Sequence, residues 1–352
     1  ASAWDADGNG VFNVDDYAGD PRVTDLNGNG MPDPQDLIWR FSDGIDGDGN
    51  GYVDDVCGWD FLEDDNDPWD ELDYGHGTAE CLWSAGEADN GAGIPGTCPN
   101  AMLLPVRVGD SFIVDINRFA QGVIFAVDSG AWLIQEALGS VNNSPLGQAA
   151  IDYAYSKGVA VIASAADEES AHQNFTCTYE RTIQVNAVQK YNQMGSFLVD
   201  QFPPSYLYLG GITNYGAHTI VSTPSDGHSS GATGRLAGIA ALVYSAAENA
   251  VRRGELWRYP GLDRPLSACE VKQILAMTAD DIDFSPDSYG VTCGLLDAII
   301  GPSERFPSTP GWDPYFGYGR VNAYEAVRAV AEGRTPPEAE ISSPRWFELL
   351  DP

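Results

Sequence analysis

The sequence is poor in basic residues, with 18 Lys and Arg against 52 Asp and Glu among 352 residues. The formal net charge of −34 at pH 7 disfavours nucleic acids and anionic membranes as partners, because both are bound through positive charge. The sequence also lacks any apolar run near the roughly 20 residues that a membrane-spanning helix needs. We therefore expect a secreted or cell-surface protein without a membrane span.

The six cysteines stand at positions 57, 81, 98, 177, 269 and 293, and their spacing is not that of a zinc site. In an extracellular protein such cysteines form disulfides, whose connectivity the sequence does not fix. The pairing that we expect joins Cys81 to Cys98 and Cys269 to Cys293.

Strand and helix patterns alternate along most of the chain. This alternation predicts an α/β fold with a mostly parallel central sheet and helices on both faces. The expected strands are residues 102–108, 131–136, 159–165 and 182–188, and the expected helices are 76–87, 116–129, 146–157, 230–252, 267–279 and 322–331.

The N-terminal segment contains three runs of Asp and Asn separated by glycines. They match a calcium loop of the EF-hand kind, in which oxygen ligands occupy positions one, three, five and twelve, a backbone carbonyl position seven, and Gly position six. A charge run is usually a solvated surface, but the repeated spacing favours Ca²⁺. The candidate ligands are Asp5, Asp7, Asn9, Val11 and Asp16 in the first loop, Asp25, Asn27, Asn29, Met31 and Asp36 in the second, and Asp46, Asp48, Asn50 and Tyr52 in the third.

The third loop departs from this pattern at its last position, where Cys57 stands. A carboxylate from Asp55 or Asp60 is the alternative ligand. The third site is therefore the least regular of the three.

Two polar residues are candidates for nucleophilic catalysis. His76 lies between glycines in Gly-His-Gly-Thr at 75–78, before a helix of small residues, and Ser230 lies in Ser-Ser-Gly-Ala-Thr-Gly at 229–234. A hydroxyl nucleophile needs a neighbouring base and a carboxylate that fixes the tautomer of that base. Taken singly, the histidine could cap a helix and the serine could be an N-cap. The remaining histidines, His172, His218 and His228, show no metal-ligand spacing and are predicted to lie on the surface or in loops.

The order of these and later motifs resembles that of the subtilisin-like serine proteases, or subtilases, over about residues 58–331. Ala-Ala-Asp-Glu at 165–168 resembles the family's Ala-Gly-Asn-Glu, Asn-Tyr-Gly recurs at 214–216, and Ala-Gly at 237–238 sets the register of the nucleophile motif. The resemblance implies a subtilisin-like three-layer fold and an acyl-enzyme mechanism. It assigns the base to His76, the nucleophile to Ser230, and the position of the family's oxyanion asparagine to Asp167.

Several residues depart from the family at this centre. Asp167 replaces the asparagine that donates to the oxyanion, and removing such a donor costs about 10²–10³-fold in rate. Gly234 and Arg235 replace a Pro-His pair, and Ala137 replaces a serine that lines the substrate cleft. We interpret the centre as degenerate, so that the protein is a pseudoprotease with a structural or binding role. The alternative is an active, calcium-dependent serine endopeptidase that uses Ser230 and His76.

The catalytic aspartate of the family has no clear counterpart in the chain. Residues 1–41 contain no strand apolar enough to carry it, and Ser-Asp-Gly-Ile-Asp at 42–46, which resembles the motif weakly, is interpreted as part of the third acidic loop. The acidic loops resemble an insertion that some secreted subtilases carry between the aspartate and the histidine. We therefore expect the aspartate upstream of Ala1, on a fragment of the same precursor that could remain bound.

The organisation that we expect is a calcium-loop region at 1–57, a subtilisin-like domain at 58–333, and a linker at 334–352 that leads to a further module. With neither an initiator Met nor a signal-peptide pattern, the sequence reads as a processed piece of a longer precursor. Its expected partners are the upstream fragment, a polypeptide substrate if the centre is active, and an extracellular or cell-surface assembly.

Overall fold

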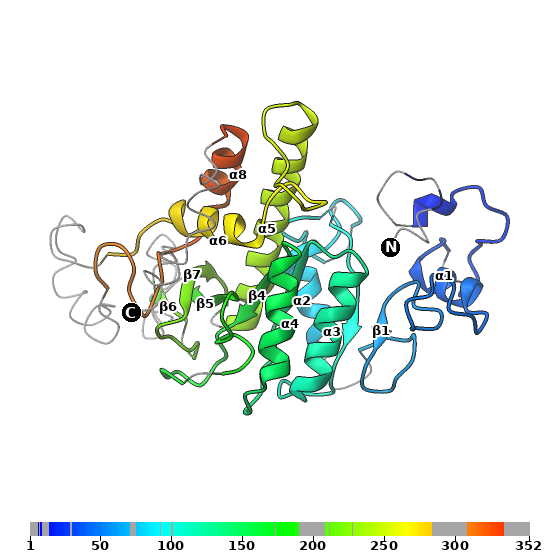
Figure 1. Cartoon of the computed structure of the whole chain (residues 1–352), viewed down its shortest axis with the longest axis horizontal. Coiled ribbons are helices and arrows are strands. Elements are labelled where there is room, and N and C mark those ends of the chain that lie inside the picture. The colour runs from blue at the N-terminus through cyan, green and yellow to red at the C-terminus, as the bar shows by residue number, and fades with distance from the viewer. Residues whose placement is uncertain are drawn as a thin grey trace.

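A mostly parallel sheet lies at the centre of the chain in a computed structural model (Figure 1). The structure describes residues 6, 8, 14–28, 30–70, 75–91, 93–99, 101–172, 174–189, 208–210, 212–226, 228–283 and 308–333. The strands of this sheet are β3 (Leu133–Glu136), β4 (Ala160–Ser164), β5 (Ile183–Gln189), β6 (Tyr208–Leu209) and β7 (Thr219–Pro224). Strand β4 pairs in parallel with β3 and β5, β7 pairs in parallel with β5, and β6 is antiparallel to β5.

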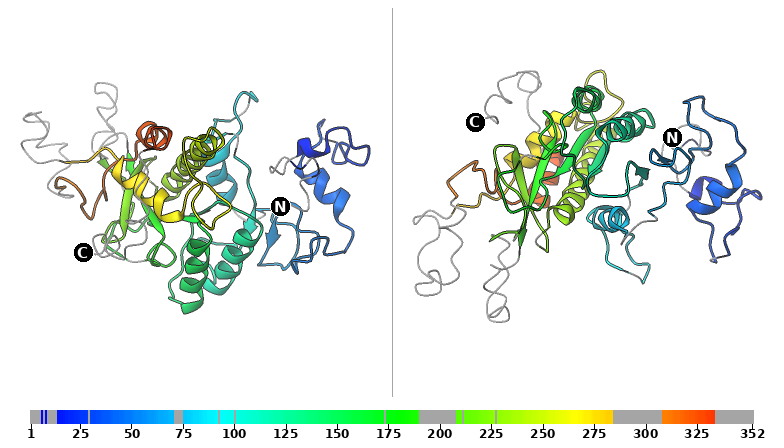
Figure 2. Two further views of the ribbon diagram at one scale, coloured as in Figure 1. Left: turned by 45° about the horizontal axis from the view of Figure 1, so that its top comes forward. Right: turned by 90° about the horizontal axis from the view of Figure 1, so that it is seen from below.

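Helices cover both faces of this sheet, as the sequence predicts. One layer contains α3 (Ile116–Asp128) and α4 (Pro145–Ser156), and the other contains α5 (Ser229–Arg252), α6 (Ala268–Met277) and α8 (Ala323–Ala331). Figure 2 shows α3 and α4 lying side by side. Helix α2 (His76–Ala85) packs against α5. The predicted three-layer arrangement is confirmed.

The alternation of side chains along β4 explains the two layers. Ala160 and Ile162 belong to the hydrophobic core shared with α5, α6 and α8, whereas Val159 and Val161 belong to the core shared with α3 and α4. Successive side chains of a strand point to opposite faces, so a strand buried on both faces must be apolar throughout. Every residue of β4 is buried, which fixes it as a central strand.

Local capping signals set several helix starts. Asp115 accepts a hydrogen bond from the amide of Asn117 at the start of α3, and Ser144 accepts one from the amide of Leu146 at the start of α4. Each such cap stabilises a helix by about 1 kcal/mol. These capping residues place the helices within one or two residues of the ranges expected from the sequence.

The acidic N-terminal region contains regular structure that the sequence reading missed. A short 3₁₀ helix spans Val14–Tyr17, and α1 spans Pro34–Phe41. Asp33 and Asp36 form a capping box at the start of α1, with Pro34 at its first position. A capping box with a proline at the first helical position predicts a helix from the sequence alone. We did not predict this helix, because Asp36 had been assigned to a calcium loop.

A second, smaller pairing connects the acidic region to the α/β part. Strand β1 (Trp59–Asp60) is parallel to β2 (Val106–Arg107), so only two residues of the strand expected at 102–108 are extended and paired. Tyr52 packs edge-on against Phe125 of α3, with ring centroids 4.9 Å apart. The predicted domain boundaries stay a prediction, and the linker at 334–352 lies outside the described residues.

Two further expectations concern cysteines and membranes. Cys81 and Cys98 are free thiols in the structure, so the predicted bond between them is not formed, and Cys293 lies outside the described residues. Within the ranges given above, no helix combines the length and the apolar character that crossing a bilayer requires.

Candidate active site

Helix α2 presents His76 as its first residue. Gly75 precedes it in the left-handed conformation, with φ of 65°, which lets the chain turn sharply into the helix. The carboxylate of Asp70, from the preceding loop, accepts a hydrogen bond of 3.2 Å from the amide of Thr78. His76 therefore does not cap the helix, and Asp70 supplies the capping carboxylate from outside it.

Helix α5 begins in a comparable way. Its N-cap residue is His228, whose side chain caps nothing, and the amide of Ser229 donates a 2.9 Å hydrogen bond to Oδ1 of Asp167. Ser229 is fully buried, with its Oγ 2.6 Å from Oγ of Ser164. Ser230 lies inside the first turn and is only partly buried, so it is not an N-cap, and the described residues offer its hydroxyl no side-chain hydrogen bond.

The two helices approach each other through glycines of α5. A Cβ at Gly234 would lie 2.7 Å from the carbonyl oxygen of Glu80 in α2, and a Cβ at Gly238 would lie 1.9 Å from Oγ1 of Thr97 and 2.7 Å from the carbonyl oxygen of Ser84. Side chains are therefore excluded at both positions. This close packing brings the start of α2, with His76, to the same region as the start of α5.

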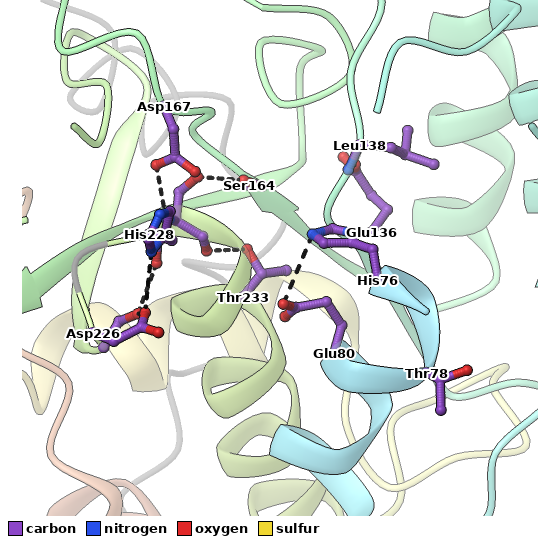
Figure 3. A network of polar contacts seen from close by, with 12 residues as sticks. His76, Thr78, Glu80, Glu136, Leu138, Ser164, Asp167, Asp226, His228 and Thr233 are labelled. Carbon is purple, nitrogen blue, oxygen red and sulfur yellow. Dashed lines mark hydrogen bonds and ion pairs between the residues drawn. The ribbon is translucent and has the colours of Figure 1, made fainter. Parts of the chain in front are cut away.

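A buried carboxylate lies between these helices. Glu80 is one turn after His76 in α2, with Oε1 at 3.9 Å from Nε2 of His76, and Figure 3 shows both side chains. Burial raises the pKa of Glu80 to about 7, although the charge of Arg235 acts in the opposite direction. Its Oε2 has no hydrogen-bond partner among the described residues.

Burial and a nearby charge shift the pKa of His76 in opposite directions. Burial lowers the pKa of its imidazole, and the negative charge of Asp70 partly opposes this shift. The ring also contacts Phe112 edge-on, with ring centroids 4.8 Å apart. Burial therefore favours the neutral imidazole, which is a base in principle.

Asp167 lies near the start of the loop that follows β4. Burial raises the pKa of its carboxyl group, although the hydrogen bond from the amide of Ser229 opposes this. Ala166, the residue before it, is left-handed with φ of 69°, a conformation that costs a residue with a Cβ about 1–2 kcal/mol. The side-chain oxygen of Asn214 accepts hydrogen bonds from the amides of Glu168 and Ser170 and so holds this loop in place.

Arg235, which departs from the family, and Glu136, which precedes the altered Ala137, both have clear contacts. The guanidinium of Arg235 lies 3.8 Å from the ring centre of Trp83 and donates a 3.0 Å hydrogen bond to the carbonyl oxygen of Pro224. Glu136, at the end of β3, is buried and accepts hydrogen bonds from the hydroxyl of Thr176 and the amide of Leu138. Burial raises the pKa of Glu136 well above its usual value, which favours the protonated form.

The second and third acidic loops share one conformation. Asp25 accepts hydrogen bonds of 2.7 and 2.9 Å from the amides three and five residues later, and Asp46 accepts bonds of 2.7 and 2.8 Å from the equivalent amides. The glycines at positions four and six of both loops have positive φ. The oxygen-rich residues present suit Ca²⁺, a hard cation that binds oxygen. The described ranges contain no group of three converging His, Cys, Asp or Glu side chains.

The ends of these loops differ from the expected pattern. Asp36 is fully buried, and its carboxylate accepts amide hydrogen bonds from Leu26, Asn27 and Asp33. Burial acts to raise the pKa of Asp36, but these backbone bonds outweigh it, so that the pKa lies below its usual value. Of the first loop, Asp5, Asp7, Asn9 and Val11 lie outside the described residues, as does Asn29 of the second.

Asp55 and Asp60, the alternative ligands of the third loop, have different surroundings. Asp55 lies within it and accepts a 2.7 Å hydrogen bond from the amide of the Asn50 side chain. Asp60 is fully buried and forms a 2.5 Å ion pair with Arg107. The carboxylate of Asp54 accepts hydrogen bonds from the amides of residues 43 and 44, which confirms that residues 42–46 belong to this loop.

The predicted residues of the reactive centre thus come from three elements that meet: His76 from α2, Ser230 from α5 and Asp167 from the loop after β4. Sequence reasoning missed Asp70, Glu80 and Glu136. The signal for Glu80 was available, because a charged residue four positions after the histidine lies on the same face of the helix.

Comparisons with known proteins agree with this architecture. A sequence model of the subtilase family matches residues 16–319. A thermophilic serine proteinase of Bacillus sp. strain AK1 is 30% identical over 285 residues, which cover 77% of this chain and 56% of that protein. Thermitase of Thermoactinomyces vulgaris is 30% identical over 281 residues, which cover 78% of this chain and 81% of thermitase.

A solved structure of a protease from Pseudoalteromonas arctica is similar with a TM-score of 0.53 and 21% identity, covering 74% of this chain and 72% of that one. At this identity the likeness shows the fold alone.

Proposed function

Because the chain belongs to the subtilase family, we propose that it is a secreted or cell-surface, calcium-binding member whose reactive centre is not an efficient endopeptidase at neutral pH. In this proposal the protein serves as a structural or binding component of an extracellular assembly. The observation that carries it is the hydrogen bond from the amide of Ser229 to the carboxylate of Asp167.

This hydrogen bond supports the proposal through the chemistry of Asp167. A subtilase stabilises the oxyanion of the tetrahedral intermediate with donors, one of them an asparagine amide. Asp167 is instead an acceptor that caps α5, and when ionised it places negative charge beside the position where negative charge develops. Both effects raise the barrier to acyl transfer.

The second candidate is an active endopeptidase that cleaves polypeptides through an acyl-enzyme at Ser230. Its support is that His76 and Ser230 lie in the first turns of two helices packed together through Gly234 and Gly238. In this case an aspartate from an upstream fragment of the precursor would complete the triad.

Labelling with a fluorophosphonate separates the two candidates. The purified protein in calcium is incubated with the probe across a range of pH, and the modified peptide is identified by mass spectrometry, with Ser230→Ala as control. Slow or absent labelling at pH 7, without cleavage of an unfolded protein substrate, is the expected result. Rapid labelling at Ser230 together with such cleavage would establish the endopeptidase.

Calcium binding is proposed from the matched loop conformations and their oxygen ligands. We expect added Ca²⁺ to raise the melting temperature, because a ligand at about 100 times its Kd stabilises the folded state by about 2.7 kcal/mol. The variants Asp25→Asn and Asp46→Asn should each weaken the calcium response in calorimetry. Equal melting curves in calcium and in a chelator would exclude a stabilising site.

A further inference from the structure

Glu80 is a buried acid that neither the family's mechanism nor the fold requires. Its side chain is 9% exposed, Figure 3 shows it between His76 and α5, and its Oε2 has no partner among the described residues. A Cβ at Gly234 would lie 3.2 Å from this Oε2, so the missing side chain of Gly234 leaves the room that the carboxylate occupies.

The charges near the pair come from several elements. Arg235 of α5 favours ionised Glu80, whereas Asp226 and Asp167, from the loops before α5 and after β4, disfavour it. Asp70, from the loop before α2, favours protonated His76. The guanidinium of Arg235 contacts the Trp83 ring and donates to the carbonyl oxygen of Pro224.

We propose that Glu80 is a positioning residue that keeps one shared proton between its own carboxyl group and Nε2 of His76 and thereby prevents the imidazole from accepting the proton of Ser230. The inference deepens the proposed function, because it names a second cause, besides Asp167, of a poor reactive centre.

The argument follows one proton shared by the pair. If His76 holds it, the imidazolium has no lone pair on Nε2, and the ionised Glu80 stabilises this form at 3.9 Å. If Glu80 holds it, an acid lies beside that lone pair and competes with the hydroxyl of Ser230. His76 can act as a base only when both groups have lost their protons. Because the pKa of Glu80 is about 7, this happens mainly above neutral pH.

The first test measures the titration of His76 by NMR in the full chain, which has only four histidines. The variant is Glu80→Gln, and the matched control is Glu87→Gln, which removes an exposed charge just after α2. His76→Gln identifies the resonance. We expect Glu80→Gln to lower the pKa of His76 by about one unit, since an opposite charge within ~4–6 Å shifts a pKa by 1–3 units. Glu87→Gln should leave it unchanged.

The second test measures fluorophosphonate labelling of Ser230 against pH in an Asp167→Asn background. The expected result is a labelling profile that Glu80→Gln moves to lower pH together with the His76 titration. An unchanged or raised His76 pKa in a folded Glu80→Gln protein would overturn the proposal, and so would a loss of labelling, which would make Glu80 a support of the base.

The two proposals can fail separately. Rapid labelling and substrate cleavage by the unaltered chain at pH 7 would remove the proposed function, and the NMR comparison would still decide the role of Glu80. A circular dichroism spectrum of each variant establishes that it is folded.

Discussion

Replacing Asp167 with asparagine tests the central claim about the reactive centre. The side-chain carbonyl oxygen of Asn can accept the 2.9 Å hydrogen bond from the amide of Ser229, so the cap of α5 is kept. The new amide group can donate to the oxyanion, which an ionised carboxylate cannot do. The substitution therefore changes the electrostatics at this position with little change in shape.

The expected gain in labelling rate can be estimated from the loss that follows when the family's asparagine donor is removed. Removing the corresponding asparagine donor costs about 10²–10³-fold in kcat, or about 2.7–4 kcal/mol, a value measured on subtilisin, a member of this family. Asp167→Asn should therefore raise the labelling rate of Ser230 at pH 7 by up to about 10²–10³-fold.

The effect of Asp167→Asn on the labelling rate should depend on pH. Burial raises the pKa of Asp167, so below that pKa the carboxyl group is neutral and can itself donate a hydrogen bond. The advantage of Asp167→Asn should be largest above this pKa and shrink as the pH falls through it. A gain that is independent of pH would contradict the assigned cause.

The control is Glu87→Gln, which removes a negative charge from an exposed side chain just after α2. It should leave labelling close to that of the unaltered chain. If Asp167→Asn is folded, keeps its melting temperature and labels no faster than the unaltered chain at any pH, the reasoning about the oxyanion position is refuted.

Three further predictions concern stability, each measured by urea denaturation. Arg107→Ala should cost about 3–5 kcal/mol, because it leaves the buried carboxylate of Asp60 without its partner, whereas a cost below 1 kcal/mol would mean that water compensates the charge. Gly238→Ala should cost about 1–3 kcal/mol, because its Cβ would collide with Thr97, and an unchanged midpoint would refute the close packing of α2 and α5. The pKa of Glu80 is about 7 in the fold against 4.5 ordinarily, so its stabilising contribution is complete below pH 4.5 and lost as the pH rises through 7. Glu80→Gln should thus gain up to about 3 kcal/mol relative to the unaltered chain at pH 8, and a constant difference from pH 4 to 8 would contradict this.

Periodicity and capping residues determined the regular elements of the α/β part. The all-apolar run of β4 and the caps at Asp115 and Ser144 are local signals, so their ranges could be read within a residue or two. The acidic region was harder, because Asp36 fits a calcium loop in the sequence pattern and also forms a capping box with Asp33 in the structure. The same residues are compatible with a calcium loop and with a helix start, and only the tertiary structure shows that a helix begins there.

The sequence by itself determined the fold class and the family, and it singled out His76, Ser230 and Asp167 as candidate site residues, because short motifs in a fixed order carry that information. Only the tertiary structure decided what surrounds them. Three contacts join segments that are distant along the chain. The carboxylate of Asp167 accepts a hydrogen bond from the amide of Ser229, Asp60 forms an ion pair with Arg107, and the side chain of Glu80 lies next to Gly234. Hydrogen bonds, burial and the resulting pKa values depend on such contacts, and no local pattern encodes them.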